Sequence, residues 1–255
     1  MALSIILGGA LGRMGREVAA CCEREGIAIA CGVDVNYTGQ PMAFPMVKGY
    51  ELVDKPADVI VDFTRPEGLP ELLKLATERG LPVVLCTTGF SEAELQSIRE
   101  ASRRIAILRS ANMSLGVYVL RSLVAQAAKA LGSTCDIEII ERHHNQKVDA
   151  PSGTALMLYE AAKAEKGEGT EAVYGRYGRA GKRKPTEIGI HAVRGGTVTG
   201  EHEVGFYGNG EELLLVHRAE NRSLFAQGAI SAARFLAGRG PGLYGMQEVA
   251  EALLQ

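Results

Sequence analysis

The sequence lacks a strong excess of charge of either sign. Its 255 residues carry 28 Lys and Arg against 30 Asp and Glu, a net charge of −2. This near balance gives no reason to expect nucleic acid or an anionic membrane as a partner. The sequence also lacks an apolar run of membrane-spanning length. The first residues have no basic stretch and lead directly into glycines, so we predict a β-strand there and not a signal peptide.

Cysteine is scarce, and its five copies form no C-x-x-C pair. The odd number favours reduced thiols, so we expect a cytoplasmic protein. A zinc site built from Cys135, His143 and His144 has no recognised ligand spacing, and we therefore predict no metal. The hydrophobic content of 46% and charged content of 23% are ordinary for a globular protein. The length allows one large domain or two moderate ones.

Up to residue 114 the chain alternates short apolar runs with segments of helical spacing. We expect strands at 4–8, 27–33, 57–63, 81–86 and 105–108. Helices are expected at 11–25, 67–79 and 91–102, the last opened by a capping box of Ser91 and Glu94, whereas 37–56 is expected to be mostly loop. Strands that alternate with helices predict a parallel sheet covered on both faces.

The pattern changes after residue 114. Helices are expected at 115–131 and 152–164, strands at 135–141, 187–193, 201–207 and 211–216, and loop at 166–184. The Gly208-Asn209-Gly210 segment between the last two strands predicts a hairpin. We therefore predict an α/β protein with two domains. A Rossmann-like parallel-sheet domain takes residues 1–114 and is completed by helices within 222–255; an α+β domain with a mixed or antiparallel sheet takes residues 115–221.

A glycine loop follows the first predicted strand and opens a helix. It runs from Gly9 through Ala10, Leu11, Gly12, Arg13 and Met14 to Gly15. Small residues let the backbone approach a pyrophosphate, and the start of the helix favours the anion. The alternative is a tight turn with no ligand. Asp34, at the end of the second strand, favours a dinucleotide, because an acidic residue there accepts hydrogen bonds from the adenosine ribose.

The cofactor preference follows from the residues beside Asp34. Val35 and Asn36 offer no positive charge for a 2′-phosphate. We therefore expect NADH to be preferred, with NADPH also used, because Arg13 in the glycine loop can offset part of the repulsion from Asp34.

The segment 141–155 combines two adjacent histidines, a lysine and a Pro-Ser-Gly-Thr turn. Each feature alone is ordinary: the histidines and Lys147 suit a solvated loop, and Pro151 and Ser152 suit the start of a helix. The combination favours a site for a small carboxylated substrate. The helix start offers N–H groups to an anion, and histidine and lysine supply positive charge and protons.

The same segment carries a resemblance to a known family. The string H-H-N-Q-K-V-D-A-P-S-G-T-A resembles the signature of 4-hydroxy-tetrahydrodipicolinate reductases, formerly called dihydrodipicolinate reductases, which serve the diaminopimelate route to lysine. Further strings fit along nearly the whole chain: G-R-M-G at 12–15, D-F-T-R-P-E at 62–67, T-T-G-F at 87–90, A-N-M-S at 111–114, E-I-G-I-H-A-V-R-G-G at 187–196 and G-E-H-E-V at 200–204.

The resemblance implies an NAD(P)H-dependent reductase of a cyclic imine dicarboxylate that assembles as a homotetramer. His143 matches the proposed acid/base histidine and Lys147 the proton donor. The residues that match substrate-binding positions are His144, Gly153 and Thr154. Those that match cofactor-contacting positions are Gly9, Ala10, Leu11, Gly12, Arg13, Met14, Asp34, Cys86, Thr87, Thr88, Ser110, Ala111, Asn112 and Met113. Cys86 and Met113 depart from the family pattern, where Gly and Phe are common.

Two other functions remain open at this point. Another two-domain Rossmann oxidoreductase, such as an amino-acid dehydrogenase, would leave the string from His143 to Thr154 unexplained. A non-catalytic protein that senses NADH would keep the glycine loop without needing His143 and Lys147. Turnover with NADH and freshly generated substrate distinguishes all three.

Overall fold

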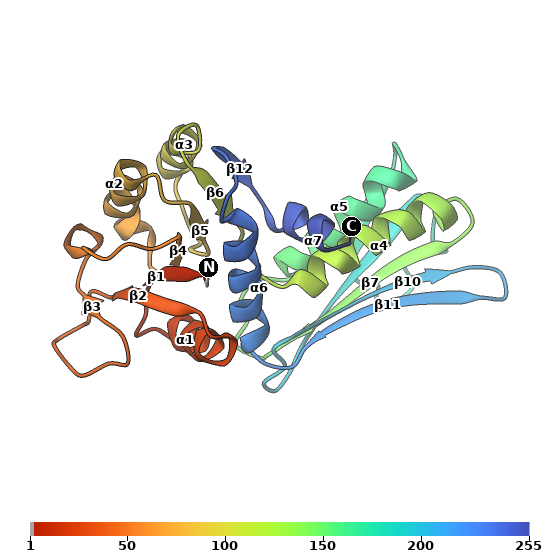
Figure 1. Cartoon of the computed structure of the whole chain (residues 1–255). Coiled ribbons are helices and arrows are strands. Elements are labelled where there is room, and N and C mark those ends of the chain that lie inside the picture. The colour runs from red at the N-terminus through yellow and green to blue at the C-terminus, as the bar shows by residue number, and fades with distance from the viewer. Residues whose placement is uncertain (1–2, 255) are drawn as a thin grey trace. The chain divides into compact units, whose positions relative to one another are not determined.

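The computed structural model describes residues 3–254, which form two compact units. The first unit contains the chain up to Leu115 and again from Arg222 onward; the second runs from Gly116 to Asn221 (Figure 1). No helix within residues 3–254 is both long and apolar enough to cross a membrane.

The first unit is built on a sheet of seven parallel strands. Their order is β12-β6-β5-β4-β1-β2-β3. The strands are β1 (Ser4–Gly8), β2 (Ala28–Val33), β3 (Met46–Val47), β4 (Val59–Asp62), β5 (Val83–Leu85), β6 (Ala106–Arg109) and β12 (Gly242–Tyr244). The chain order reverses at β1, which lies between β2 and β4. The crevice outside the carboxyl ends of the strands at such a switch point is where open α/β sheets bind ligands.

The helices of the first unit are α1 (Arg13–Glu25), α2 (Leu69–Arg79), α3 (Glu92–Ala101), α6 (Ser223–Leu236) and α7 (Met246–Leu254), with short 3-10 turns η1 (Tyr50–Leu52) and η2 (Pro66–Gly68). The predicted capping box of α3 is confirmed, because Ser91 and Glu94 each accept a hydrogen bond from the other's backbone. Fully buried side chains such as Ile6, Ile60 and Ile107 form the core.

The second unit is a five-stranded mixed sheet in the order β11-β10-β7-β9-β8. Its strands are β7 (Asp136–His143), β8 (Glu171–Tyr174), β9 (Glu187–Arg194), β10 (Gly200–Tyr207) and β11 (Glu212–Ala219). β10 pairs antiparallel with β7 and β11, and β9 pairs parallel with β7 and β8. The predicted hairpin joins β10 to β11. Helices α4 (Leu115–Leu131) and α5 (Gly153–Lys166) contribute to one buried core with this sheet (Figure 1).

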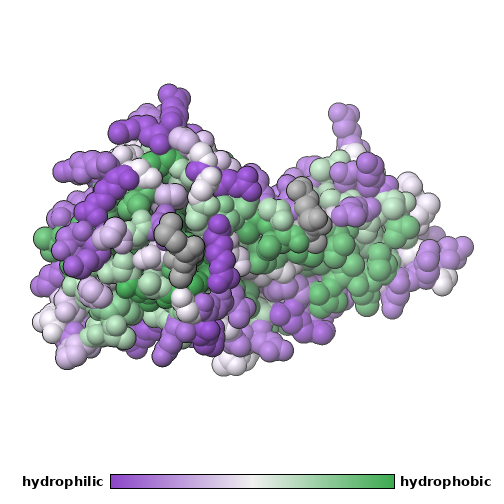
Figure 2. Space-filling view, viewed as in Figure 1, coloured by the Kyte–Doolittle hydropathy of each residue, from purple (hydrophilic) through white to green (hydrophobic). Residues whose placement is uncertain are grey.

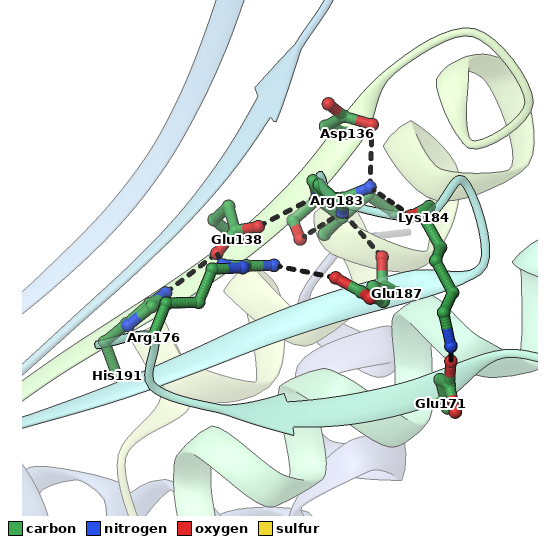
Figure 3. A network of polar contacts seen from close by, with 9 residues as sticks. Asp136, Glu138, Glu171, Arg176, Arg183, Lys184, Glu187 and His191 are labelled. Carbon is green, nitrogen blue, oxygen red and sulfur yellow. Dashed lines mark hydrogen bonds and ion pairs between the residues drawn. The ribbon is translucent and has the colours of Figure 1, made fainter. Parts of the chain in front are cut away.

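Side chains along β7 alternate between two faces of this sheet. Ile137, Ile139, Glu141 and His143 lie on the buried face. The outer face carries ion pairs, in which Glu138 accepts hydrogen bonds from arginines of the segment after β8 and from a histidine of β9 (Figure 3). Hydrophobic side chains also reach the surface of this unit, as the space-filling view shows (Figure 2).

The structure contains short strands that were not predicted. The expected loop 166–184 contains β8, and β12 was also not predicted; the segment 37–56 is mostly loop, as predicted, but includes β3 and η1. These three strands have at most four residues and lie at the edges of their sheets, so they carry little hydrophobic periodicity. Two strands are also longer than predicted. β7 extends to His143 and does not end at residue 141, because His143 pairs with Arg194 of β9. β11 extends to Ala219 and does not end at residue 216, because Ala219 pairs with Gly200 of β10.

Candidate active site

The glycine loop connects β1 to α1 through backbone contacts. Gly9 has a φ of +72°, a value that favours glycine. The N–H of Gly9 donates to the carbonyl of Val33, and that of Gly12 to the carbonyl of Gly9, at 2.8 and 2.9 Å. Gly12 is the N-cap of α1; no side chain caps the helix and its first turn contains no acidic residue. The backbone N–H groups at this helix start therefore suit an anion.

The three glycines of this loop differ in what a side chain would meet. A β-carbon at Gly15 would lie 2.1 Å from the carbonyl oxygen of Gly9, and one at Gly9 would lie 2.7 Å from that of Phe63. These two glycines are required for packing of the protein itself. A β-carbon at Gly12 would meet only the Gly9 oxygen, at 3.1 Å, and Gly12 is exposed. The absence of a side chain at Gly12 therefore leaves space for a ligand.

Asp34 directly follows β2 and is hydrogen-bonded to the glycine loop. It is buried, and its two carboxylate oxygens accept hydrogen bonds from the backbone N–H groups of Leu11 and Asn36, both at 3.0 Å. Each carboxylate oxygen has a second lone pair, so the group can still accept a bond from a ribose hydroxyl. Val35 is 79% exposed beside it.

A buried carboxylate, Asp62, organises the end of β4 in the same unit. It accepts hydrogen bonds from the hydroxyl groups of Tyr50, Thr64 and Thr87, each at 2.7 Å. Burial and the nearby Asp62 charge raise the pKa of the Cys86 thiol well above its ordinary value. Cys86 therefore stays protonated and neutral. Tyr50 and Asp62 received no role from the sequence, because nothing in it placed residue 50 beside the end of β4.

The other expected cofactor residues follow β5 and β6. Thr87 is buried, Thr88 and Ala111 are exposed, and Ser110 donates through its hydroxyl to the carbonyl of Asn112 at 2.6 Å. Met113 is only 3% exposed. The carboxyl ends of parallel strands lie at one edge of a sheet, so these residues share an edge with the glycine loop and Asp34.

In the second unit, the fully buried carboxylate of Glu141 is the centre of a polar cluster. It accepts four hydrogen bonds: from His143 Nδ1 at 2.7 Å, from Arg194 Nη1 and Nη2 at 2.7 and 2.8 Å, and from the backbone N–H of Ser152 at 3.0 Å. Burial would raise the pKa of Glu141, but the bonds from Arg194, His143 and Ser152 outweigh it and lower the pKa. Glu141 is therefore ionised.

His143 lies at the end of β7 with 9% of its surface exposed. Its ring packs edge-on against that of His202 in β10, with centroids 5.1 Å apart. His202 Nε2 lies 2.9 Å from the hydroxyl of Ser152, the N-cap of α5. Burial and the nearby His143 lower the pKa of His202 to about 3, so this ring is neutral. Burial also lowers the pKa of His143, although Glu141 acts in the opposite direction.

Lys147 lies in the loop between β7 and α5, and its ammonium is 2.9 Å from the carboxylate of Asp149. The hydrogen bond from Lys147 lowers the pKa of Asp149. Arg194 holds the same loop, because its Nη2 donates to the carbonyl of Asp149 at 2.7 Å. His144 is half-buried, and its carbonyl accepts a hydrogen bond from the N–H of Lys147 at 3.2 Å.

The first residue of α5 faces open space. Gly153 is exposed, and a β-carbon there would meet no atom within 4 Å. Ser152 caps the helix by accepting from the N–H of Ala155 at 3.1 Å, and the first turn has no acidic residue. Thr154 is the second residue of the helix. This helix start is a second position that suits an anion.

The zinc arrangement considered for Cys135, His143 and His144 is incompatible with this geometry. Cys135 precedes β7 and His143 ends it, so the strand separates them by about 26 Å, at roughly 3.3 Å per residue. Within residues 3–254, no group of three or more His, Cys, Asp or Glu side chains is placed to hold a metal ion.

Sequence reasoning gave no role to Glu141, Arg194 or His202. Glu141 could have been found from the sequence, because residues two apart on a strand share a face and Glu141 precedes His143 by two. The other two come from β9 and β10, and only the strand register brings them to the site.

Comparisons with known proteins match nearly the whole chain. Family models described as "Dihydrodipicolinate reductase, N-terminus" and "Dihydrodipicolinate reductase, C-terminus" match residues 3–113 and 116–250. A 4-hydroxy-tetrahydrodipicolinate reductase from Caldanaerobacter subterraneus subsp. tengcongensis is 49% identical over 98% of both chains. One from Clostridium tetani is 46% identical over 95% of this chain and 94% of its own.

A solved structure has the same fold. It is a dihydrodipicolinate reductase from Paenisporosarcina sp. TG-14 with dipicolinate bound; it is 24% identical, covers 97% of this chain and 99% of its own, and superposes with a TM-score of 0.81. The family models together match nearly the whole chain, and the two relatives match at least 95% of it. The chain therefore belongs to the dihydrodipicolinate reductase family.

Proposed function

We propose that His143 and Lys147 supply the proton in the reaction of this family, and that the start of α5 binds a carboxylate of the substrate. The chain is an oxidoreductase of the 4-hydroxy-tetrahydrodipicolinate reductase type and uses a nicotinamide cofactor. The observation that carries the proposal is that His143, Lys147 and the open N-terminus of α5 all belong to one unit and are linked through Glu141 and Arg194.

The substrate in this proposal is a cyclic imine with two carboxylates, formed when the 4-hydroxy compound loses water. One carboxylate binds at the first turn of α5, where Gly153 leaves open space and Thr154 and His144 lie nearby in sequence. The dipicolinate bound to the Paenisporosarcina enzyme is a planar dicarboxylate of the same class.

The nicotinamide cofactor, when bound, supplies the hydride. The residues proposed to hold it are those of the glycine loop, Asp34 and the segments after β5 and β6. The exposed position of Gly12, where no side chain fills the space, fits a pyrophosphate. The protein's own contribution to the chemistry is to deliver a proton to the carbon beside the one that receives the hydride. His143 is buried, and the ionised Glu141 stabilises its protonated form.

The roles of His143 and Lys147 are tested by truncation. We expect His143→Ala and Lys147→Ala each to lower kcat by roughly 10² to 10⁴, the usual effect of a lost proton donor. This corresponds to about 3 to 5 kcal/mol of barrier. Cofactor affinity should stay unchanged, because neither residue belongs to the first unit.

The matched control is Gln146→Ala, which removes an exposed side chain from the same loop. It should retain wild-type kcat. Near-normal turnover of both the His143 and the Lys147 variants would show that the proton comes from elsewhere.

The glycine loop is tested by two alanine variants. Gly12→Ala should fold and lose only about 1 kcal/mol of stability, because its β-carbon meets a single oxygen at 3.1 Å and alanine is a poorer N-cap than glycine. Its NADH affinity should nevertheless fall at least about 10-fold, because the side chain occupies the space proposed for the pyrophosphate. Gly15→Ala should instead destabilise the fold, by about 1 to 3 kcal/mol.

Urea unfolding measures the stability of both variants, and calorimetric titration measures their NADH affinity. Wild-type NADH affinity of a folded Gly12→Ala protein would contradict the assignment.

We propose that NADH is preferred over NADPH and that both are used. The buried charge of Asp34 repels a 2′-phosphate, and exposed Arg13 offsets part of this repulsion. Arg13→Ala should therefore weaken NADPH binding several-fold more than NADH binding, when dissociation constants are measured at one low ionic strength. Tighter binding of NADPH than of NADH by the wild-type protein would refute the role of Asp34.

We also propose that the chain forms a homotetramer through the sheet of the second unit. β11 is an edge strand of eight residues, and its outer-face side chains Leu214 and Val216 are 44% and 40% exposed. An exposed, partly hydrophobic edge strand favours association with another chain. Light scattering at micromolar concentration should give four times the monomer mass, and Val216→Glu should lower it. A monomeric wild-type protein under these conditions would rule out the tetramer.

A further inference from the structure

We propose that Glu141 and Arg194 are positioning residues for the reaction, and that together they hold neutral His143 in the tautomer with its proton on Nδ1 and its lone pair on Nε2. The inference rests on the proposed role of His143. It assigns Nε2 as the ring nitrogen that exchanges a proton with the substrate, and it explains why an ion pair is buried at the end of β7.

The tautomer follows from the chemistry of the contacts. An ionised carboxylate only accepts hydrogen bonds, and Glu141 Oε2 lies 2.7 Å from His143 Nδ1. Nδ1 therefore carries a hydrogen, and Nε2 is the nitrogen that exchanges a proton with the substrate. The second oxygen, Oε1, is also occupied, because it accepts from Arg194 and from the N–H of Ser152.

The surroundings of Nε2 agree with this assignment. A β-carbon at Gly200, the first residue of β10, would lie 3.1 Å from His143 Nε2. Glycine at this position keeps a side chain away from the nitrogen. The edge-on ring of His202, with its centroid 5.1 Å away, restricts rotation of the His143 ring.

The Glu141–Arg194 pair also holds the other two parts of the proposed substrate site. Glu141 binds the N–H of Ser152 at the start of α5, and Arg194 binds the carbonyl of Asp149 in the loop that carries Lys147. Three groups from separate segments are thus tied to one ion pair. Precise placement of such groups can change a rate by 10²-fold or so for an error of about 1 Å.

The charged and titratable groups that face His143 come from every neighbouring element. They are Glu141 on β7 itself, Arg194 on β9, the neutral His202 on β10 and Lys147 in the following loop. Of these, only Glu141 is negative. Removing its charge should therefore lower the pKa of His143 further.

The isosteric variant Glu141→Gln reverses the hydrogen-bond pattern. If the amide oxygen takes the place of Oε1, it keeps the bonds from Arg194 Nη2 and from Ser152. The amide N–H₂ then faces His143 Nδ1, which must become an acceptor. This orientation also turns the N–H₂ toward one donor, Arg194 Nη1, which loses this acceptor. The opposite orientation is less favourable, because the N–H₂ would face two donors, the N–H of Ser152 and Arg194 Nη2. The variant should therefore hold neutral His143 with its hydrogen on Nε2.

The same strand offers a matched control on its outer face. Glu138 also accepts hydrogen bonds from two arginines and a histidine, namely Arg176, Arg183 and His191 (Figure 3). Glu138 lies three residues from Glu141 but points to the other side of the sheet. Glu138→Gln thus makes the same chemical change in a similar ion-pair network that does not touch His143.

The experiment compares wild type, Glu141→Gln and Glu138→Gln in full-length protein. For Glu141→Gln we expect kcat to fall about 10²-fold with NADH affinity unchanged, and the alkaline limb of the pH profile to move to lower pH. Glu138→Gln should stay within about 2-fold of wild type. Nitrogen NMR of ¹⁵N-histidine protein, with His143 assigned from His143→Asn, should show hydrogen on Nδ1 of neutral His143 in wild type and on Nε2 in Glu141→Gln.

The outcomes separate this inference from the proposed function. If His143→Ala is inactive while Glu141→Gln retains wild-type kcat and pH profile, the positioning role is wrong and the role of His143 stands. If His143→Ala is active, the proposed role of His143 in proton transfer fails, and the positioning role fails with it. An equal loss in Glu138→Gln would indicate general damage to β7 and overturn the inference. A wild-type His143 with its neutral hydrogen on Nε2 would also overturn it, whether or not any variant folds.

Discussion

The second unit depends on the ionised, fully buried carboxylate of Glu141. A carboxylate removed from water costs several kcal/mol unless it is paired and hydrogen-bonded. Glu141 meets this requirement with four donors, which come from β7, β9 and the start of α5. The sheet register follows the same need: His143 lies opposite Arg194, and Glu141 lies opposite His202. A shift of one residue in the pairing with β9 would turn Arg194 to the other face and leave the carboxylate without its ionic partner.

The first unit is subject to a different constraint: its backbone N–H groups must lie close to the proposed anion. Its strand order places β1 between β2 and β4, so the turn after β1 lies at the switch point. Asp34 and the close backbone contacts of Gly9 and Gly15 then fix this turn before any ligand binds. The proposed anion sites of the two units are therefore both helix starts, one capped by glycine and one by Ser152.

The sequence predicted most of the architecture because its long elements are strongly periodic. The alternation of strands and helices up to residue 114 indicated the parallel sheet, and the Ser91 capping box was found from four residues. The short edge strands β3, β8 and β12 were missed, since two to four residues carry too little pattern. His143 and Lys147 were identified as candidates from their local string. Their partners were not, because Arg194 and His202 reach the site only through the register of β9 and β10, which no local pattern encodes.

In the proposed reaction, the chain reduces a cyclic imine dicarboxylate with a hydride from the cofactor and a proton from the protein. Isotope transfer in the wild-type enzyme distinguishes these two sources. NADH deuterated at the transferred position should place one deuterium on a ring carbon of the product in ordinary water, and unlabelled NADH in heavy water should place one on the neighbouring carbon. No oxidation of NADH with freshly generated substrate, or both labels on the same carbon, would contradict the account.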